Sequence, residues 1–172
     1  MDVLEIISDY EIERGKPVPS KKHSLIQTKI IIAIAQLYPK YWALSEISVS
    51  LSGSEKVPNL AIYEKANFET EEEEIRTTQI PLTVIEILSP TQNINELVEK
   101  SKIYFENGVK SYWLVVPVLK SVFVDYEYGT FVGFQPLVSG TIFGRNGVGS
   151  PNLKKQLKFP FSTGRFGSLN LF

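Results

Sequence analysis

The sequence predicts a mixed α/β fold, in which a central mixed β-sheet is flanked by helices. Three observations indicate this class. Apolar residues recur with helical spacing over 20–38 and 93–108, and segments typical of strands lie between and after these helices. The second helix separates two apolar strands, 81–88 and 111–118, which is typical of a crossover between parallel strands. The segment 121–137 alternates about a glycine and predicts a C-terminal β-hairpin.

Length and composition fit one soluble globular domain spanning 1–172. The chain has 172 residues, of which 43% are hydrophobic and 22% are charged, ordinary proportions for a folded domain. The net charge of −1 provides no global basic field for nucleic acid, although a local basic groove would suffice. The absence of cysteine excludes disulfides and thiolate metal sites. We see no signal peptide, and no apolar run approaches the roughly 20 residues of a membrane span. We therefore expect a cytoplasmic protein.

The first expected elements are an extended pair of strands and a helix. The segment 9–20 predicts a strand that turns at Gly15 into a second short piece, which its two prolines keep extended. Ser20 is suited to cap the helix that follows, and Pro39 should end it. The apolar face of this helix comprises Ile26, Ile30, Ala33, Ile34 and Leu37.

The middle of the chain predicts further strands and a second helix. Alternation over 42–53 predicts one half-buried strand, and 57–64 predicts another. An acidic run at 69–74, typical of a solvated loop, separates these strands from the next apolar strand. The helix over 93–108 should stop at Gly108. Its apolar face comprises Ile94, Leu97, Val98, Ser101, Tyr104 and Phe105.

Glu86 stands in the middle of the apolar segment IPLTVIEILSP, residues 80–90. Its strand face also carries Val84 and Leu88, so the carboxylate emerges from an apolar surface, where an unpaired charge costs several kcal/mol. One explanation is a structural ion pair with a nearby lysine. The other is a metal ligand or general base at the end of a central strand, where open sheets place their sites.

Two lysines on the following helix are candidate partners of Glu86. Lys100 and Lys102 lie on opposite edges of the apolar face, and periodicity alone does not choose between them. Asn59, directly after Pro58, is either a turn residue or a neutral oxygen ligand for a hard cation.

The remaining polar candidates are Glu11 and His23. Glu11 is either a surface strand residue or another polar group of the same site. His23, the single histidine, is best explained as a residue near a helix start, because no nucleophile elbow accompanies it. No glycine-rich phosphate loop follows any strand, which argues against nucleotide binding.

Four segments, in this order and spacing, resemble one protein family. They are YEIERGKPVPSKKHSLIQTKIIIAI, VPNLAIY, VIEILSPT and EKSKIYFENGVKSYWLVVP. Over residues 8–137 the chain resembles the Uma-type putative restriction endonucleases, a branch of the PD-(D/E)xK nuclease superfamily. The resemblance implies a restriction-endonuclease-like core with an extra N-terminal strand pair and a C-terminal β-hairpin. It also implies an endonuclease that hydrolyses DNA phosphodiester bonds.

The resemblance further implies roles for particular residues. Glu11, Glu86 and Lys100 match catalytic positions, which chooses between the two lysines. Asn59, Glu86 and the backbone carbonyl of Ile87 match the ligands of Mg²⁺, for which Mn²⁺ can substitute. In such a site the metal lowers the pKa of a bound water and stabilises charge on the phosphate. The lysine positions that water or neutralises the transition state.

The sequence departs from the family pattern at two acidic positions. Asn59 and Val116 each stand where the family has aspartate. The loss of a charge at Asn59 predicts weak binding of Mg²⁺. Two functions stay open: an endonuclease of weak activity, and a catalytically inactive module of the same fold that binds DNA or a protein partner. A third hypothesis is a homodimer formed through the edge of the aromatic hairpin at 121–134.

Overall fold

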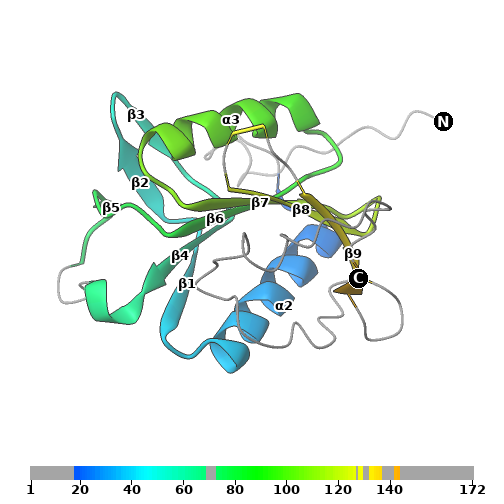
Figure 1. The fold of residues 1–172 in the computed structure, drawn as a ribbon, viewed down its shortest axis with the longest axis horizontal. Coiled ribbons are helices and arrows are strands. Elements are labelled where there is room, and N and C mark those ends of the chain that lie inside the picture. The colour runs from blue at the N-terminus through cyan, green and yellow to red at the C-terminus, as the bar shows by residue number, and fades with distance from the viewer. Residues whose placement is uncertain (1–17, 69–72, 127, 130–131, 137–141, 144–172) are drawn as a thin grey trace, which may run out of the picture.

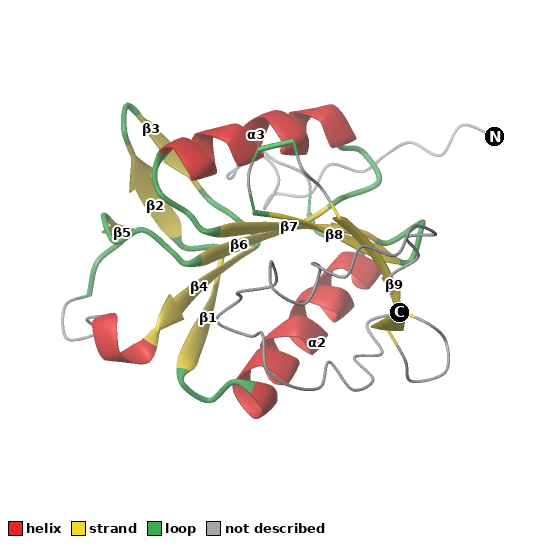
Figure 2. Ribbon diagram, viewed as in Figure 1, coloured by secondary structure: helices red, strands yellow, loops and turns green. Residues whose placement is uncertain are grey.

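The computed structural model of the protein describes residues 18–68, 73–126, 128–129, 132–136 and 142–143. Two helices lie on opposite sides of a large β-sheet, and a smaller sheet lies beside the helix α3 (Figure 1). The predicted class, a mixed sheet flanked by helices, is confirmed (Figure 2). The strand pair expected around Gly15 lies outside the described residues.

In the described part of the chain, the large sheet has seven strands in the order β1-β4-β6-β7-β8-β9-β10. Its central pair, β6 and β7, is parallel, as the intervening helix predicts, and its other neighbours are antiparallel. The strands are β1 Tyr41–Ser45, β4 Leu60–Glu64, β6 Thr83–Ile87, β7 Ser111–Val116, β8 Ser121–Asp125, β9 Val132–Pro136 and β10 Ile142–Phe143.

The smaller sheet has three strands in the order β3-β2-β5. In it β2 is antiparallel to β3 and parallel to β5. The strands are β2 Ser48–Leu51, β3 Ser54–Lys56 and β5 Arg76–Thr77, and a short 3-10 helix, η1 Lys65–Asn67, follows β4.

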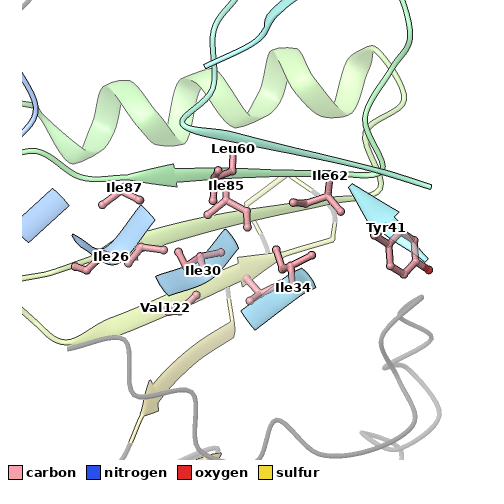
Figure 3. Packing of buried hydrophobic residues seen from close by; sticks show 11 residues of the cluster. Ile26, Ile30, Ile34, Tyr41, Leu60, Ile62, Ile85, Ile87 and Val122 are labelled. Carbon is pink, nitrogen blue, oxygen red and sulfur yellow. The ribbon is translucent and has the colours of Figure 1, made fainter. Parts of the chain in front are cut away.

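The helix α2, Lys21–Leu37, packs on one face of the large sheet. The predicted cap is confirmed, because Ser20 Oγ accepts a hydrogen bond from the His23 amide at 3.2 Å. Ile26, Ile30 and Ile34 of the predicted apolar face are buried. Leu37 is 43% exposed, so the last turn of this face extends beyond the core. Figure 3 shows the packed isoleucines against side chains of the central strands.

The helix α3, Ile94–Glu106, packs on the opposite face (Figure 1). Asn93 caps its start, and Gly108 lies just beyond its end with a φ of 96°, a conformation that favours glycine. A second buried cluster joins this helix to the large sheet and to β2. Its members are Val49, Leu51, Val84, Leu97, Tyr104, Val109, Tyr112, Leu114 and Val116.

The prediction of one strand over 42–53 is wrong. The chain forms β1 in the large sheet, leaves it at Glu46, and forms β2 in the small one. Glu46 has a φ of 52°, which turns the backbone sharply. Val49 and Leu51 are nevertheless buried, as the alternation predicted. Alternating burial therefore identified the inward side chains but not the change of sheet.

The predicted C-terminal hairpin is formed by β8 and β9, with Gly129 in the turn at a φ of 86°. The outer strand β9 also has a neighbour, because Pro136 pairs with Ile142 and Gln135 with Phe143 of β10. The edge invoked for a homodimer is thus already paired within the chain over part of its length.

Neither described helix is long and apolar enough to cross a membrane.

Candidate active site

Glu86 occupies a buried position near the carboxyl end of β6. It shares the α3-facing side of this strand with Val84, while Ile85 and Ile87 face α2. The residue is only 3% exposed. A carboxylate so placed needs a compensating partner, because removing an ionised carboxylate from water costs several kcal/mol.

Lys100 supplies that partner from α3. Its Nζ lies 2.5 Å from Glu86 Oε1, and the same ammonium donates to the Val57 carbonyl at 3.4 Å. Tyr104, one turn further along α3, donates its hydroxyl to Glu86 Oε1 at 3.4 Å. Lys102 instead faces Glu106 at 4.0 Å. The structure thus brings Glu86 together with the lysine that the resemblance indicated.

The protonation of this pair reflects opposing effects. Burial raises the pKa of the Glu86 carboxyl. The Lys100 ammonium, a backbone hydrogen bond from Asn59 and the Tyr104 hydroxyl favour the ionised form, but the pKa stays above its ordinary value. Burial, followed by the charge of Glu86, raises the pKa of Tyr104, so its hydroxyl remains a hydrogen-bond donor. The ionised carboxylate is therefore held at an energetic cost.

Asn59 links the ends of two strands beside Glu86. The β4–β6 register pairs Leu60 with Ile85, so its continuation places Asn59 opposite Glu86. The side-chain oxygen Oδ1 of Asn59 accepts the Ile87 amide at 2.7 Å. This hydrogen bond leaves one lone pair of the amide oxygen for any further contact. Asn59 thus joins the start of β4 to the end of β6, a structural role that its position in the sequence did not reveal.

The main chain of Asn59 is held as firmly as its side chain. Its carbonyl accepts from Gln27 Nε2 at 3.3 Å and from the Glu46 amide at 3.2 Å. These donors come from α2 and from the point where the chain leaves β1. No local pattern singles out Gln27 or Glu46, because each role depends on how separate segments pack together.

The oxygen donors predicted for a metal gather at this point only in part. The Glu86 carboxylate, the Asn59 amide oxygen and the Ile87 carbonyl are all hard donors, which suit Mg²⁺. Glu11, the other predicted carboxylate, lies outside the described residues. Within the described ranges, no group of three or more histidine, cysteine, aspartate or glutamate side chains is gathered as a metal site. The donor set fits a hard cation in kind, with little negative charge.

His23 lies near the same end of β6, on the α2 side. It is 4% exposed, and its Nδ1 lies 3.2 Å from Ser89 Oγ. Burial lowers the pKa of His23, although the charge of Glu46 opposes this. A neutral, packed histidine agrees with the expectation of a residue near a helix start.

A comparison with protein families bears on what this pair does. The model of the Uma2 family, described as "Putative restriction endonuclease", matches residues 4–127. This chain belongs to the Uma2 family. The predicted resemblance is therefore confirmed, and membership of Uma2 supports a nuclease-like function. The matched range includes Glu86 and Lys100 and ends before β9 begins.

Comparisons with individual proteins add the fold. No curated protein matches the chain. Among solved structures, the chain is similar to a protein from Anabaena variabilis described as a putative nuclease belonging to DUF820, at 24% sequence identity. The similarity covers 70% of this chain and 71% of that one, with a TM-score of 0.63. This Uma2 member therefore has a nuclease-like fold.

Proposed function

We propose that this Uma2 protein is a metal-dependent endonuclease that hydrolyses DNA phosphodiester bonds and binds its metal weakly. The observation that carries the proposal is the contact between the buried Glu86 carboxylate and the partly exposed Lys100 ammonium, 2.5 Å apart. The two side chains come from different elements and meet near the carboxyl ends of the parallel strands β6 and β7. Buried charged pairs with a shifted pKa are typical of catalytic sites.

The chain's own groups suit phosphodiester hydrolysis. Glu86 and the hard oxygens of Asn59 and Ile87 would hold Mg²⁺ or Mn²⁺, which when bound supplies charge stabilisation and a water of lowered pKa. Lys100, whose side chain is 23% exposed, can reach a phosphate while remaining near Glu86. Its ammonium would neutralise charge that develops on the phosphate. Tyr104 would keep the Glu86 carboxylate in place through its hydroxyl.

A catalytically inactive, DNA-binding relative is the second candidate, and one observation favours it. Asn59 is neutral, and its Oδ1 is already engaged with the Ile87 amide at 2.7 Å. A site with a single described carboxylate binds Mg²⁺ less well than one with two, because this cation prefers charged oxygens. In that case Glu86 and Lys100 remain as a structural ion pair.

Cleavage of supercoiled plasmid DNA in Mg²⁺ or Mn²⁺ tests the proposal. The variants are Glu86→Gln, Asn59→Asp and, as a matched control, Glu106→Gln, which changes an exposed glutamate at the end of α3. We expect cleavage by the natural chain and the control, none by Glu86→Gln, and faster cleavage by Asn59→Asp. Cleavage by Asn59→Asp alone would favour the inactive relative. Equal cleavage by Glu86→Gln and the natural chain would refute the site.

A further inference from the structure

A surface near the candidate active site combines exposed lysines with an exposed apolar turn. We call it the turn surface; it consists of Lys21 and Lys22 at the start of α2, and Val118, Leu119 and Lys120 between β7 and β8. The two parts are in contact, because Lys22 Nζ donates to the Pro117 carbonyl at 3.0 Å. The helix start and the strand turn therefore present one continuous surface.

The apolar part of the turn surface faces solvent. Val118 is 81% exposed and Leu119 is 56% exposed. The turn is closed by two backbone hydrogen bonds, from the Leu119 amide to the Val116 carbonyl at 3.1 Å and from the Lys120 amide to the Pro117 carbonyl at 3.3 Å. Burial in the described fold does not account for these two apolar side chains, and contact with a partner would remove them from water.

The basic part of the turn surface comprises three lysines without a neutralising carboxylate among the described residues. In the part of the chain that the structure describes, no carboxylate forms an ion pair with Lys21, Lys22 or Lys120. The first turn of α2 also contains no acidic residue. At the other end of the sheet, by contrast, Lys40 lies 3.9 Å from Glu64. The positive charge of the turn surface is thus available to an anionic partner.

The turn surface lies at the same end of the large sheet as Glu86. Glu86 is paired with Leu114 of the parallel strand β7, and Pro117 follows three residues later. At about 3.3 Å per residue, the turn begins roughly 10 Å beyond the carboxylate along the strand direction. Phosphates of one DNA strand are spaced about 3.4 Å apart along the duplex axis. A backbone that passes Glu86 can therefore reach the turn surface within a few nucleotides.

We propose that the turn surface binds the sugar–phosphate backbone of double-stranded DNA. Lys21, Lys22 and Lys120 contact phosphates, while Val118 and Leu119 pack against sugars at the groove edge. The inference rests on the proposed function in one respect, that DNA is the molecule presented to Glu86. It goes further by assigning the binding to five residues that take no part in the Glu86–Lys100 contact.

The test is the salt dependence of binding to a mixed-sequence DNA duplex, measured by fluorescence anisotropy in EDTA to prevent cleavage. Lys21→Gln/Lys22→Gln/Lys120→Gln removes the three charges of the turn surface. Its matched control removes three exposed lysines at the opposite end of the sheet, Lys40, Lys65 and Lys110. A second variant, Val118→Ser/Leu119→Ser, removes the apolar contacts. Thermal unfolding establishes that each variant is folded.

The two parts of the surface predict different results. Each lost phosphate contact should reduce the slope of log K against log salt by about 0.9. The slope of the turn-surface triple variant should therefore be smaller in magnitude by close to three times this amount, while the control keeps the natural slope. The Val118→Ser/Leu119→Ser variant should keep the slope but bind about tenfold more weakly, since loss of apolar burial is not salt-dependent.

Equal slopes for the natural chain and the turn-surface triple variant would overturn the inference, as would equal losses in the triple variant and its control. Absence of duplex binding at low salt would also overturn it and leave the turn surface to another partner. The plasmid assay keeps the two proposals distinct. If the natural chain cleaves DNA but the turn-surface triple variant keeps the natural salt slope, only the proposal for the turn surface is refuted. If the triple variant loses the slope but the natural chain does not cleave DNA, only the enzymatic proposal is refuted.

Discussion

Replacing Asn59 with aspartate should create a protein whose stability depends on divalent metal. The aspartate can accept the Ile87 amide in place of the Asn59 amide oxygen, which now does so at 2.7 Å. The change therefore preserves the link between β4 and β6. What it adds is a second negative charge opposite Glu86, which already lies in a buried site with Lys100 as its counter-charge.

The size of the effect follows from the strand register. Side chains directly opposite in an antiparallel pair have Cβ atoms about 5 Å apart. Two like charges at that distance repel by about 3 kcal/mol at an effective dielectric constant near 20. In EDTA at pH 8, Asn59→Asp should therefore lower the free energy of unfolding by up to about 3 kcal/mol. For a chain of this length that corresponds to a fall of roughly 6–12 °C in Tm.

Metal should restore most of this loss. A cation that binds only the folded state, present at a concentration of about 100 times its dissociation constant, adds about 2.7 kcal/mol to the free energy of unfolding. Thermal unfolding of the natural chain and Asn59→Asp, each in EDTA, Mg²⁺ and Mn²⁺, measures both quantities. The double variant Asn59→Asp/Glu86→Gln is the control, because it keeps the new carboxylate but removes the old one. It should respond to metal much less.

Two results would refute the reasoning. If Asn59→Asp is as stable as the natural chain in EDTA, the two side chains are not close enough to repel. If its Tm rises with metal no more than that of the natural chain, the oxygens at the ends of β4 and β6 do not form a cation site. Either result stands independently of whether the protein cleaves DNA.

Three further predictions concern the pair and the core. Lys100→Met leaves the Glu86 carboxylate without its counter-charge and should cost about 3 kcal/mol at neutral pH by urea unfolding, with a smaller loss in acid; an equal loss at every pH would argue against the ion pair. Because burial raises the pKa of Glu86 above its ordinary 4.5, the folded state retains the proton more tightly than the unfolded state. This tighter proton binding contributes fully to the free energy of unfolding below the unfolded pKa, and the contribution is lost as pH rises through the folded pKa. The natural chain should therefore lose stability from about pH 4.5 upward. Glu86→Gln should not show this decline, and parallel curves would contradict the assignment. Ile30→Ala, at a side chain 2% exposed, should cost about 2–5 kcal/mol, whereas Ile32→Ala, at one 49% exposed, should change stability little in the same denaturation assay.

The elements of this fold follow from patterns within short segments. Helical periodicity located α2 and α3, and the serine and glycine signals at their ends agree with the observed cap and stop. The parallel pairing of β6 and β7 followed from the helix between them. The change of sheet at Glu46 did not, because a glutamate at a φ of 52° carries no local signal that distinguishes it from a strand residue.

In the candidate site, too, local patterns predicted some features, while others depend on contacts between segments distant in sequence. The apolar context of Glu86 predicted a buried carboxylate, and periodicity left Lys100 and Lys102 as equal candidates until the family resemblance chose Lys100. The hydrogen bond from the Ile87 amide to Asn59 could not be foreseen, since it depends on the register of two strands distant in sequence. The contacts of Gln27 and Ser89 depend on the placement of α2 in the same way.

The Glu86–Lys100 contact joins residues only 14 positions apart, within the segment that forms β6, α3 and β7. A contact of such short sequence separation costs little loop-closure entropy. It can form early in folding, before the strands contributed by the more distant parts of the chain are in place. The Glu86 carboxylate would then lose its water while the rest of the sheet is still assembling, so its desolvation would add to the folding barrier. A substitution of this glutamate would therefore be expected to change the rate of folding as well as the proposed chemistry.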